Sequence, residues 1–282
     1  MRYFAILMLT LAACFGAQAL ALRAVGGRTA KSESNYYSSL GRIQAATVSP
    51  AEVMLLGGSI TGRLPDRIHG YRGVANMGCD GGHAVDTLRA MDQGLLPTAP
   101  VLVIECNSLY RALEPKPSEV GLAMNRAWFG AGMRVPSISA YARPSAFFYS
   151  LLLARRMGDF GEPDPDGLRA TGMPVRLEGP APTVEDPAER ALATELQALL
   201  MRLHGKGCRT IFVWYPPGRL GGFEPPSWIF STIAGSHSEW WDLGVQAQPD
   251  LVVLTDGAHM AAPSAARTLV SLLKGIAQSG TR

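Results

Sequence analysis

The chain has little cysteine, little charge and no familiar metal or nucleotide motif. Four cysteines occur in 282 residues and none are spaced as Cys-x-x-Cys, so neither a zinc site nor a redox pair is indicated. Charged residues make up 17% and the net charge is +3, without the basic face that a nucleic-acid-binding protein needs. P-loop, strand-linked Gly-x-Gly-x-x-Gly and His-Glu-x-x-His motifs do not occur. We therefore expect no cofactor, no metal and no nucleic-acid partner.

Long apolar runs are also rare, and only one is long enough to span a membrane. After Arg2, residues 3–22 carry no charge, and Ala17-Gln18-Ala19 has the small-x-small form of a signal-peptidase site. We predict that residues 1–21 are a signal peptide and that the protein is exported, to the periplasm or beyond. Two alternatives stay open: a lipid on Cys14, which follows a lipobox-like sequence, or an uncleaved membrane anchor.

The other cysteines, Cys79, Cys106 and Cys208, are odd in number and lie inside apolar runs. We interpret them as buried free thiols, because unpaired cysteine behaves as a small apolar residue.

Short apolar runs recur after residue 50, with helical patterns between them. The runs are continuous rather than alternating, which is typical of strands buried on both faces. The predicted strands are residues 53–56, 73–76, 101–104, 210–214 and 251–254. The predicted helices are residues 81–93, 145–157, 187–204 and 263–277. This order predicts an α/β fold of the flavodoxin-like kind, a three-layer α/β/α sandwich with a mostly parallel five-stranded sheet.

The remaining segments complete the predicted domain organisation. Residues 22–50 are polar and small, and we interpret them as a linker with a surface helix or loop. Residues 51–282 then form a single domain. An irregular insertion occupies about residues 110–187, where residues 161–187 are rich in Pro, Gly, Asp and Glu. It is either part of a substrate cleft or a surface insertion.

Polar residues follow several predicted strands. Ser59 lies on a glycine-rich turn after the first strand, although the spacing differs from the Gly-x-Ser-x-Gly elbow. Asp256 and His259 follow the last strand, and a carboxylate three residues away can fix the imidazole tautomer so that the other ring nitrogen accepts a serine proton. Since parallel strands end at one edge of the sheet, Gly78 and Asn107 are expected there too.

Four sequence blocks resemble, in order, those of the SGNH (GDSL-type) hydrolases. They extend from about residue 53 to 275, with few matching residues between them. The blocks are Gly57-Gly58-Ser59-Ile60, Asn76-Met77-Gly78-Cys79-Asp80-Gly81, Ile104-Glu105-Cys106-Asn107-Ser108 and Asp256-Gly257-Ala258-His259.

This resemblance implies a serine esterase without a cofactor. Ser59 would be the nucleophile, His259 the general base and acid, and Asp256 the residue that orients His259. The oxyanion hole would combine the backbone N–H groups of Ser59 and Gly78 with the side-chain amide of Asn107. Exported proteins of this kind act on acyl groups of cell-envelope or extracellular polysaccharides, so glycan deacetylation is the first expectation and a lipid or short-chain ester the second.

Three positions depart from the family pattern. Gly58 replaces the usual aspartate before the serine, Glu105 replaces a glycine, and Ser108 replaces an aspartate. Glu105 brings a charge near the site, so either the pocket differs or this carboxylate points away. Two alternatives therefore stay open: an acyltransferase acting on a sugar hydroxyl, and a catalytically silent glycan-binding protein of the envelope.

Other residue groups have weaker signals. Three arginines after the serine block, Arg63, Arg67 and Arg72, form either a solvated face or a contact for an acidic sugar or phosphate. The aromatic residues before the last predicted strand are expected to pack under a loop or to stack on sugar rings; they are Phe223, Trp228, Phe230, Trp240 and Trp241. The histidines outside the predicted site lack metal-ligand spacing and are expected at the surface or at helix ends; they are His69, His83, His204 and His237.

Overall fold

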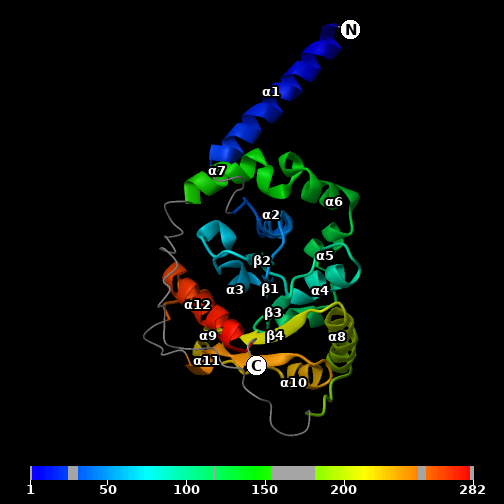
Figure 1. Cartoon of the computed structure of the whole chain (residues 1–282), viewed down its shortest axis with the longest axis vertical. Coiled ribbons are helices and arrows are strands. Elements are labelled where there is room, and N and C mark those ends of the chain that lie inside the picture. The colour runs from blue at the N-terminus through cyan, green and yellow to red at the C-terminus, as the bar shows by residue number, and fades with distance from the viewer. Residues whose placement is uncertain (1, 25–30, 117, 154–181, 247–251, 280–282) are drawn as a thin grey trace.

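The protein is a three-layer α/β/α sandwich around a five-stranded parallel sheet (Figure 1). The computed structural model describes residues 2–24, 31–116, 118–153, 182–246 and 252–279. The strand order is β2-β1-β3-β4-β5, and every neighbouring pair is parallel. The strands are β1 Val53–Gly57, β2 Val74–Gly78, β3 Val101–Glu105, β4 Arg209–Trp214 and β5 Glu239–Asp242. The predicted fold class is confirmed.

Alternate residues of each strand face two separate apolar cores. On β1, Met54 and Leu56 belong to one core, whereas Val53 and Leu55 belong to the other. This division explains the continuous apolar runs, because successive side chains of a strand point to opposite faces of the sheet.

The two faces of the sheet are covered by unequal sets of helices. The first core is closed by α2 Asn35–Ala46, α4 Ala84–Asp92, α8 Pro187–Gly205 and α10 Ser227–Ala234. The second core is closed by α12 Ala262–Ser279. In Figure 1, α12 and α8 lie on opposite sides of the sheet. The predicted helices at 81–93, 187–204 and 263–277 therefore form, each within a few residues of its expected bounds.

The fifth strand is not the one predicted from hydropathy. Residues 252–254 form no strand, Leu251 lies outside the described residues, and Leu254 makes only an isolated antiparallel bridge to Met260. The edge strand is instead β5, where Trp240 and Trp241 pack into the two different cores. The prediction of a strand at 251–254 is therefore wrong. Burial of the two tryptophans of β5 at this edge of the sheet stabilises the fold more than burial of the aliphatic run would.

The segment expected to be a linker contains a buried helix. Ser34 caps α2 by accepting a hydrogen bond from the Tyr37 N–H, and Leu40 and Ile43 are fully buried in the first core. A helix in this region was expected, but at the surface. Because α2 contains polar residues, the sequence does not indicate that the helix is buried. Gln44 is one of them: it is also buried, and its side-chain amide forms hydrogen bonds with backbone atoms of distant residues.

The described part of the predicted insertion is largely helical. It contains η2 Leu109–Leu113, α5 Glu119–Met124, α6 Ala127–Arg134, η3 Pro136–Ile138, η4 Ala140–Ala142 and α7 Pro144–Leu153. The expectation of an irregular segment is thus wrong for residues 118–153. The predicted helix at 145–157 begins as expected, although residues 154–157, like most of the Pro- and Gly-rich stretch at 161–187, lie outside the described residues.

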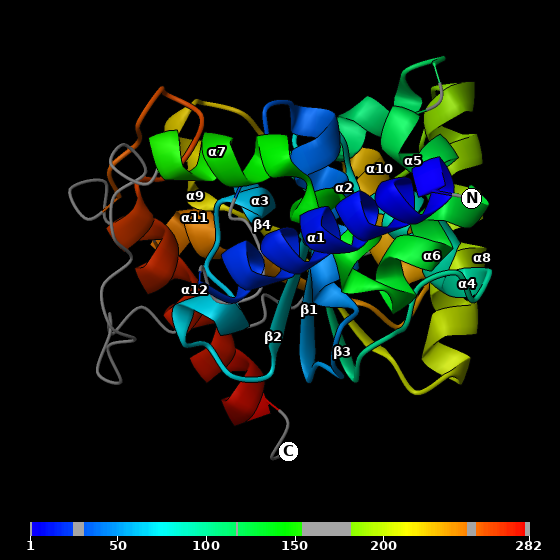
Figure 2. The same ribbon diagram turned by 90° about the horizontal axis from the view of Figure 1, so that it is seen from above.

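The apolar N-terminal run forms α1 Arg2–Ala24, which extends away from the domain (Figure 1). Among the described helices it alone is long and apolar enough to cross a membrane. Only Leu22 of this helix is buried, and α1 reaches α7 only at its C-terminal end (Figure 1); Figure 2 views the domain from the side on which α1 projects. This length and composition suit a signal sequence or a membrane anchor, which is compatible with export.

The cysteines have the predicted environments. Cys79, Cys106 and Cys208 are buried free thiols, whereas Cys14 is exposed on α1. Burial raises the pKa of the Cys79 thiol to about 12, so this residue behaves as part of the apolar core.

Candidate functional site

Ser59 lies on a sharp turn that a buried carboxylate holds in place. The chain leaves β1 at Gly57 and enters the short helix α3 Ser59–Gly62. Glu105 Oε2 accepts hydrogen bonds from the backbone N–H of Gly58 at 2.9 Å, from the N–H of Thr61 at 2.8 Å and from the Thr61 hydroxyl at 2.6 Å. Glu105 therefore ties the end of β3 to both sides of the serine.

This carboxylate is fully buried beneath the turn and points away from solvent. Burial raises the pKa of Glu105, and hydrogen bonds from Thr61 and Gly58 oppose that effect only in part. Of the two possibilities left by the sequence, a changed pocket or a carboxylate that points away, the structure has the second.

Steric crowding explains why glycine precedes Ser59. A Cβ at Gly58 would lie 2.7 Å from the Ser108 Oγ and 2.9 Å from the Gly82 carbonyl oxygen. The turn therefore has no room for the aspartate that the SGNH pattern carries here, while Glu105 supplies a carboxylate from below.

Asp256 and His259 lie on a tight loop between β5 and α12. The loop closes through a hydrogen bond from the Thr255 N–H to the His259 carbonyl oxygen at 2.8 Å, and Gly257 adopts a left-handed φ of 76°. Asp256 Oδ1 accepts the backbone N–H groups of Ala258 at 3.2 Å and His259 at 2.9 Å. The loop thus orients its own carboxylate, although no regular strand precedes it.

The structure brings Ser59, His259 and Asp256 together as predicted. His259 Nε2 lies 2.8 Å from Ser59 Oγ, across 200 residues of sequence, and His259 Nδ1 lies 2.8 Å from Asp256 Oδ2. With the imidazole proton on Nδ1, beside the carboxylate, Nε2 is left to accept the serine proton. The arrangement has the connectivity of a nucleophile, a base and an orienting acid.

Charge and exposure suit these roles. Burial opposes ionisation of Asp256, but hydrogen bonds from the His259 side chain and from backbone N–H groups outweigh it and lower the pKa of this carboxyl. Asp256 therefore stays anionic beside the imidazole. Its side chain is 48% exposed and that of His259 19%, so the group lies at the surface.

Gly78 is at the predicted edge of the sheet but has a different role. Its N–H donates to Asn76 Oδ1 at 2.8 Å within the protein. A Cβ at Gly78 would lie 2.3 Å from the Gly62 nitrogen and 2.9 Å from the Gly58 carbonyl oxygen. The Gly78 N–H is therefore not open to an oxyanion, contrary to the prediction; the missing side chain of Gly78 instead allows α3 to pack against the end of β2.

The Gly78→Ala substitution is expected to destabilise the fold by about 1–3 kcal/mol, because the new methyl group collides with the backbone of α3. Urea unfolding monitored by circular dichroism would measure this change. Gly94→Ala is a matched comparison for the loss of a glycine in which a new Cβ meets no neighbour, although its left-handed φ of 75° carries strain of its own. A stable Gly78→Ala protein would contradict the packing role.

Asn107 is anchored to the end of β4. Its Oδ1 accepts the Tyr215 N–H at 2.9 Å, and its Nδ2 donates to the Tyr215 carbonyl oxygen at 3.1 Å. The amide nitrogen carries two hydrogens, so one remains for a ligand. The oxyanion role of Asn107, and that of the Ser59 backbone N–H, stays a prediction.

The sequence did not reveal Glu105 as the organiser of the site. It appeared there only as a departure from the family pattern. An acidic residue inside a buried strand was the available signal, because a carboxylate in such a position requires donors around it.

The aromatic and histidine predictions resolve mostly in favour of structural roles. Trp228, Trp240 and Trp241 are buried, so they are not available to stack on sugars, whereas Phe223 is 67% exposed. His204 stacks on His237, and His69 belongs to the cap of the 3-10 turn η1 Arg67–His69. His83 lies at a helix end, before α4, but is buried rather than at the surface.

Comparisons with known proteins identify no relative: no family model, no curated protein and no solved structure matches this chain.

Proposed function

We propose that this protein is an exported serine esterase that removes an acyl group, most simply acetyl, from a cell-envelope or extracellular polysaccharide. The observation that carries the proposal is the continuous contact from Ser59 Oγ to His259 to Asp256, at 2.8 Å for each step. The four sequence blocks that resemble SGNH hydrolases support the same activity.

The reaction follows from this geometry. Ser59 Oγ attacks the acyl carbon while His259 Nε2 takes the hydroxyl proton. His259 then gives that proton to the alcohol oxygen as the ester C–O bond breaks, which leaves the acyl group on Ser59. A water molecule, deprotonated by His259, releases the carboxylic acid and restores the serine. Asp256 remains ionised and stabilises the imidazolium throughout.

The negative oxygen of the tetrahedral intermediate needs nearby donors. The Ser59 N–H and the second hydrogen of Asn107 Nδ2 are our candidates. Each such donor contributes on the order of 3 kcal/mol to lowering the barrier in related sites.

The exposure of the site favours a large substrate over a small buried one. Asp256 is half-exposed and Ser59 and His259 are partly exposed, so the three residues lie at the surface rather than in a deep cavity. The same openness admits a sugar hydroxyl in place of water, which makes acyl transfer the second candidate. Product analysis with an added sugar acceptor separates the two reactions, because only transfer yields a new sugar ester.

Labelling with a fluorophosphonate tests the proposal directly. This probe is expected to modify Ser59, which mass spectrometry of the digested protein would locate, because His259 activates that hydroxyl. The Ser59→Ala variant should lose the label. Absence of labelling in the folded wild-type protein would favour the alternative of a catalytically silent glycan-binding protein.

The helix α1 provides the export signal in this proposal. Cleavage near residue 21, lipidation at Cys14 and retention as an anchor predict different masses for the protein recovered from cells. Intact mass spectrometry of the mature protein distinguishes these three outcomes.

A further inference from the structure

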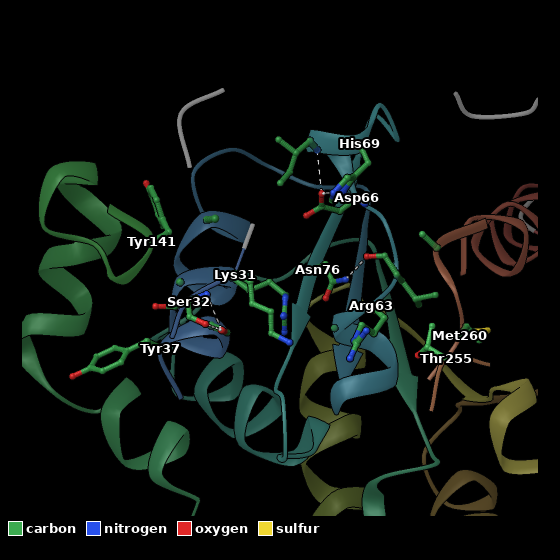
Figure 3. A pocket seen from close by; sticks show the side chains of 18 residues that line it. Lys31, Ser32, Tyr37, Arg63, Asp66, His69, Asn76, Tyr141, Thr255 and Met260 are labelled. Carbon is green, nitrogen blue, oxygen red and sulfur yellow. Dashed lines mark hydrogen bonds and ion pairs between the residues drawn. The ribbon is translucent and has the colours of Figure 1, made fainter. Parts of the chain in front are cut away.

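A pocket with several cationic side chains lies next to the Ser59 turn (Figure 3). It is lined by Lys31, by Arg42 of α2 and by Arg63, which directly follows α3. Thr255 and Met260 line it as well, and they flank Asp256 and His259 in the sequence. The pocket is thus bordered by both segments that carry the proposed catalytic residues.

Among the described residues, Arg42 alone of these three cations forms an ion pair. Arg42 contacts both carboxylate oxygens of Asp80, at 3.3 and 3.4 Å, and donates to the Gly78 carbonyl oxygen. The side chains of Lys31 and Arg63 make no ion pair or hydrogen bond with the part of the chain that the structure describes. Both residues are half-buried, and Figure 3 shows them lining the same pocket.

The charges around Lys31 are mixed. Burial lowers the pKa of Lys31; among the nearby charges Asp80 has the largest effect and raises this pKa, whereas Arg63 and Arg42 lower it. The carboxylate that lines the pocket, Asp66, accepts the Ile68 N–H and contacts His69 Nδ1 in the cap of η1.

The remaining arginines that follow the serine do not share this arrangement. Arg67 is committed to structure, because its guanidinium donates to the carbonyl oxygens of Ala45, Ala46 and Ser49. Arg72 is exposed and does not line the pocket. Of the three arginines singled out in the sequence, Arg63 alone lies in the pocket.

We propose that Lys31 and Arg63 bind an anionic group, a carboxylate or a phosphate, carried by the substrate of the Ser59 centre. This inference rests on the proposed esterase and specifies its substrate as an acidic molecule. An anion between the two cations relieves their repulsion, and the planar guanidinium can pair with two oxygens at once. The substrate is then held on one side of Ser59 while its ester reaches the hydroxyl.

Direct binding tests this subsite without relying on catalysis. The probes are galacturonic acid for a carboxylate, glucose 6-phosphate for a phosphate and glucose as the neutral reference, each titrated into the full chain by calorimetry. Arg63→Gln and Lys31→Met should weaken binding of the preferred acidic probe by about 10–100-fold. Arg72→Gln removes the same charge outside the pocket and should bind like the wild type.

The comparison between probes also identifies the source of the negative charge. Preference for galacturonic acid indicates an acidic sugar, and preference for glucose 6-phosphate indicates a phosphorylated one. Binding of glucose as tight as that of both acidic probes, or equal binding by the wild type and the Arg63→Gln protein, would overturn the inference. Circular dichroism of each variant checks that the fold is retained.

Kinetics separate this inference from the proposed function. If the protein is an esterase with this subsite, Arg63→Gln lowers kcat/KM for an O-acetylated galacturonate and leaves that for O-acetylated glucose unchanged. If the acidic probes bind but neither ester is cleaved, the anion site stands and the esterase proposal fails. If both esters are cleaved equally well and no acidic probe binds, the esterase stands and the anion site fails.

Discussion

Ester hydrolysis is expected to fall by about 10⁴-fold or more when either Ser59 or His259 is replaced by alanine. Ser59→Ala removes the nucleophile, whereas His259→Ala leaves the hydroxyl protonated. The two groups lie 2.8 Å apart and act together, so loss of either one disables the nucleophilic mechanism. The double variant should therefore be no slower than the single ones. Initial rates with p-nitrophenyl acetate at neutral pH measure all three.

The control is a histidine outside the site. His204 is exposed at the end of α8, stacked on His237, and His204→Ala should retain the wild-type rate. Asp256→Asn is expected to lie between the extremes, because it keeps the loop but removes the charge that orients the imidazole. A loss smaller than about tenfold in Ser59→Ala would contradict a nucleophilic role for this serine.

The sequence contains Asp-x-x-His three times, which shows what spacing alone can and cannot predict. Asp66 and His69 approach to 3.1 Å, and Asp256 and His259 to 2.8 Å, but the first pair caps the turn η1. In the third, residues 80–83, the aspartate pairs instead with an arginine of α2. Two of the three pairs thus satisfy the local geometry. Only the tertiary structure decides which imidazole meets a serine, and that information was available in the sequence solely through the order of the four SGNH-like blocks.

The elements that were predicted correctly are those whose burial is apolar. β1 and β3 read as continuous aliphatic runs because both faces of the sheet are covered. β5 begins with Glu239 and ends with Asp242, so its short apolar centre was assigned to a loop. α2 was missed as a core element for a related reason, since buried polar residues such as Gln44 find their hydrogen-bond partners only in the folded protein.

The nucleophile and the base of the site could be predicted from the sequence, but the residues that hold them in position could not. Gly78 follows the family pattern in sequence, yet its N–H is taken by Asn76. That hydrogen bond joins residues two apart in the sequence. No sequence pattern distinguishes it from a Gly78 N–H that is left open to a ligand. Glu105 likewise has partners on both sides of Ser59 that no pattern in β3 indicates.

Glu105→Ala is expected to destabilise the protein by about 3 kcal/mol or more and to remove most of the esterase activity. It leaves the buried N–H groups of Gly58 and Thr61 without an acceptor, on both sides of the serine whose position they set. Glu105→Gln keeps an acceptor oxygen and should retain most of both properties. Urea unfolding and initial rates with p-nitrophenyl acetate would measure the two effects.

The pair of variants separates positioning from charge. If Glu105 acts by holding the turn, the glutamine variant recovers kcat while the alanine variant does not. If instead both variants lose activity equally with their folds intact, the negative charge itself is required and the positioning role is contradicted. Fluorophosphonate labelling of Ser59 in each variant reports on the hydroxyl independently of turnover.

The pH dependence of stability gives a further test of the same carboxyl. Because burial raises the pKa of Glu105 in the folded state above the ordinary value of 4.5, the folded protein binds this proton more tightly than the unfolded chain. The resulting stabilisation is present in full below pH 4.5 and is lost as the pH rises through the raised pKa. Glutamine cannot titrate, so the free energy of unfolding of the wild type, measured against that of Glu105→Gln, should decline across this interval. A difference that is flat with pH, or that rises, would mean that the hydrogen bonds from Gly58 and Thr61 outweigh burial and keep Glu105 ionised.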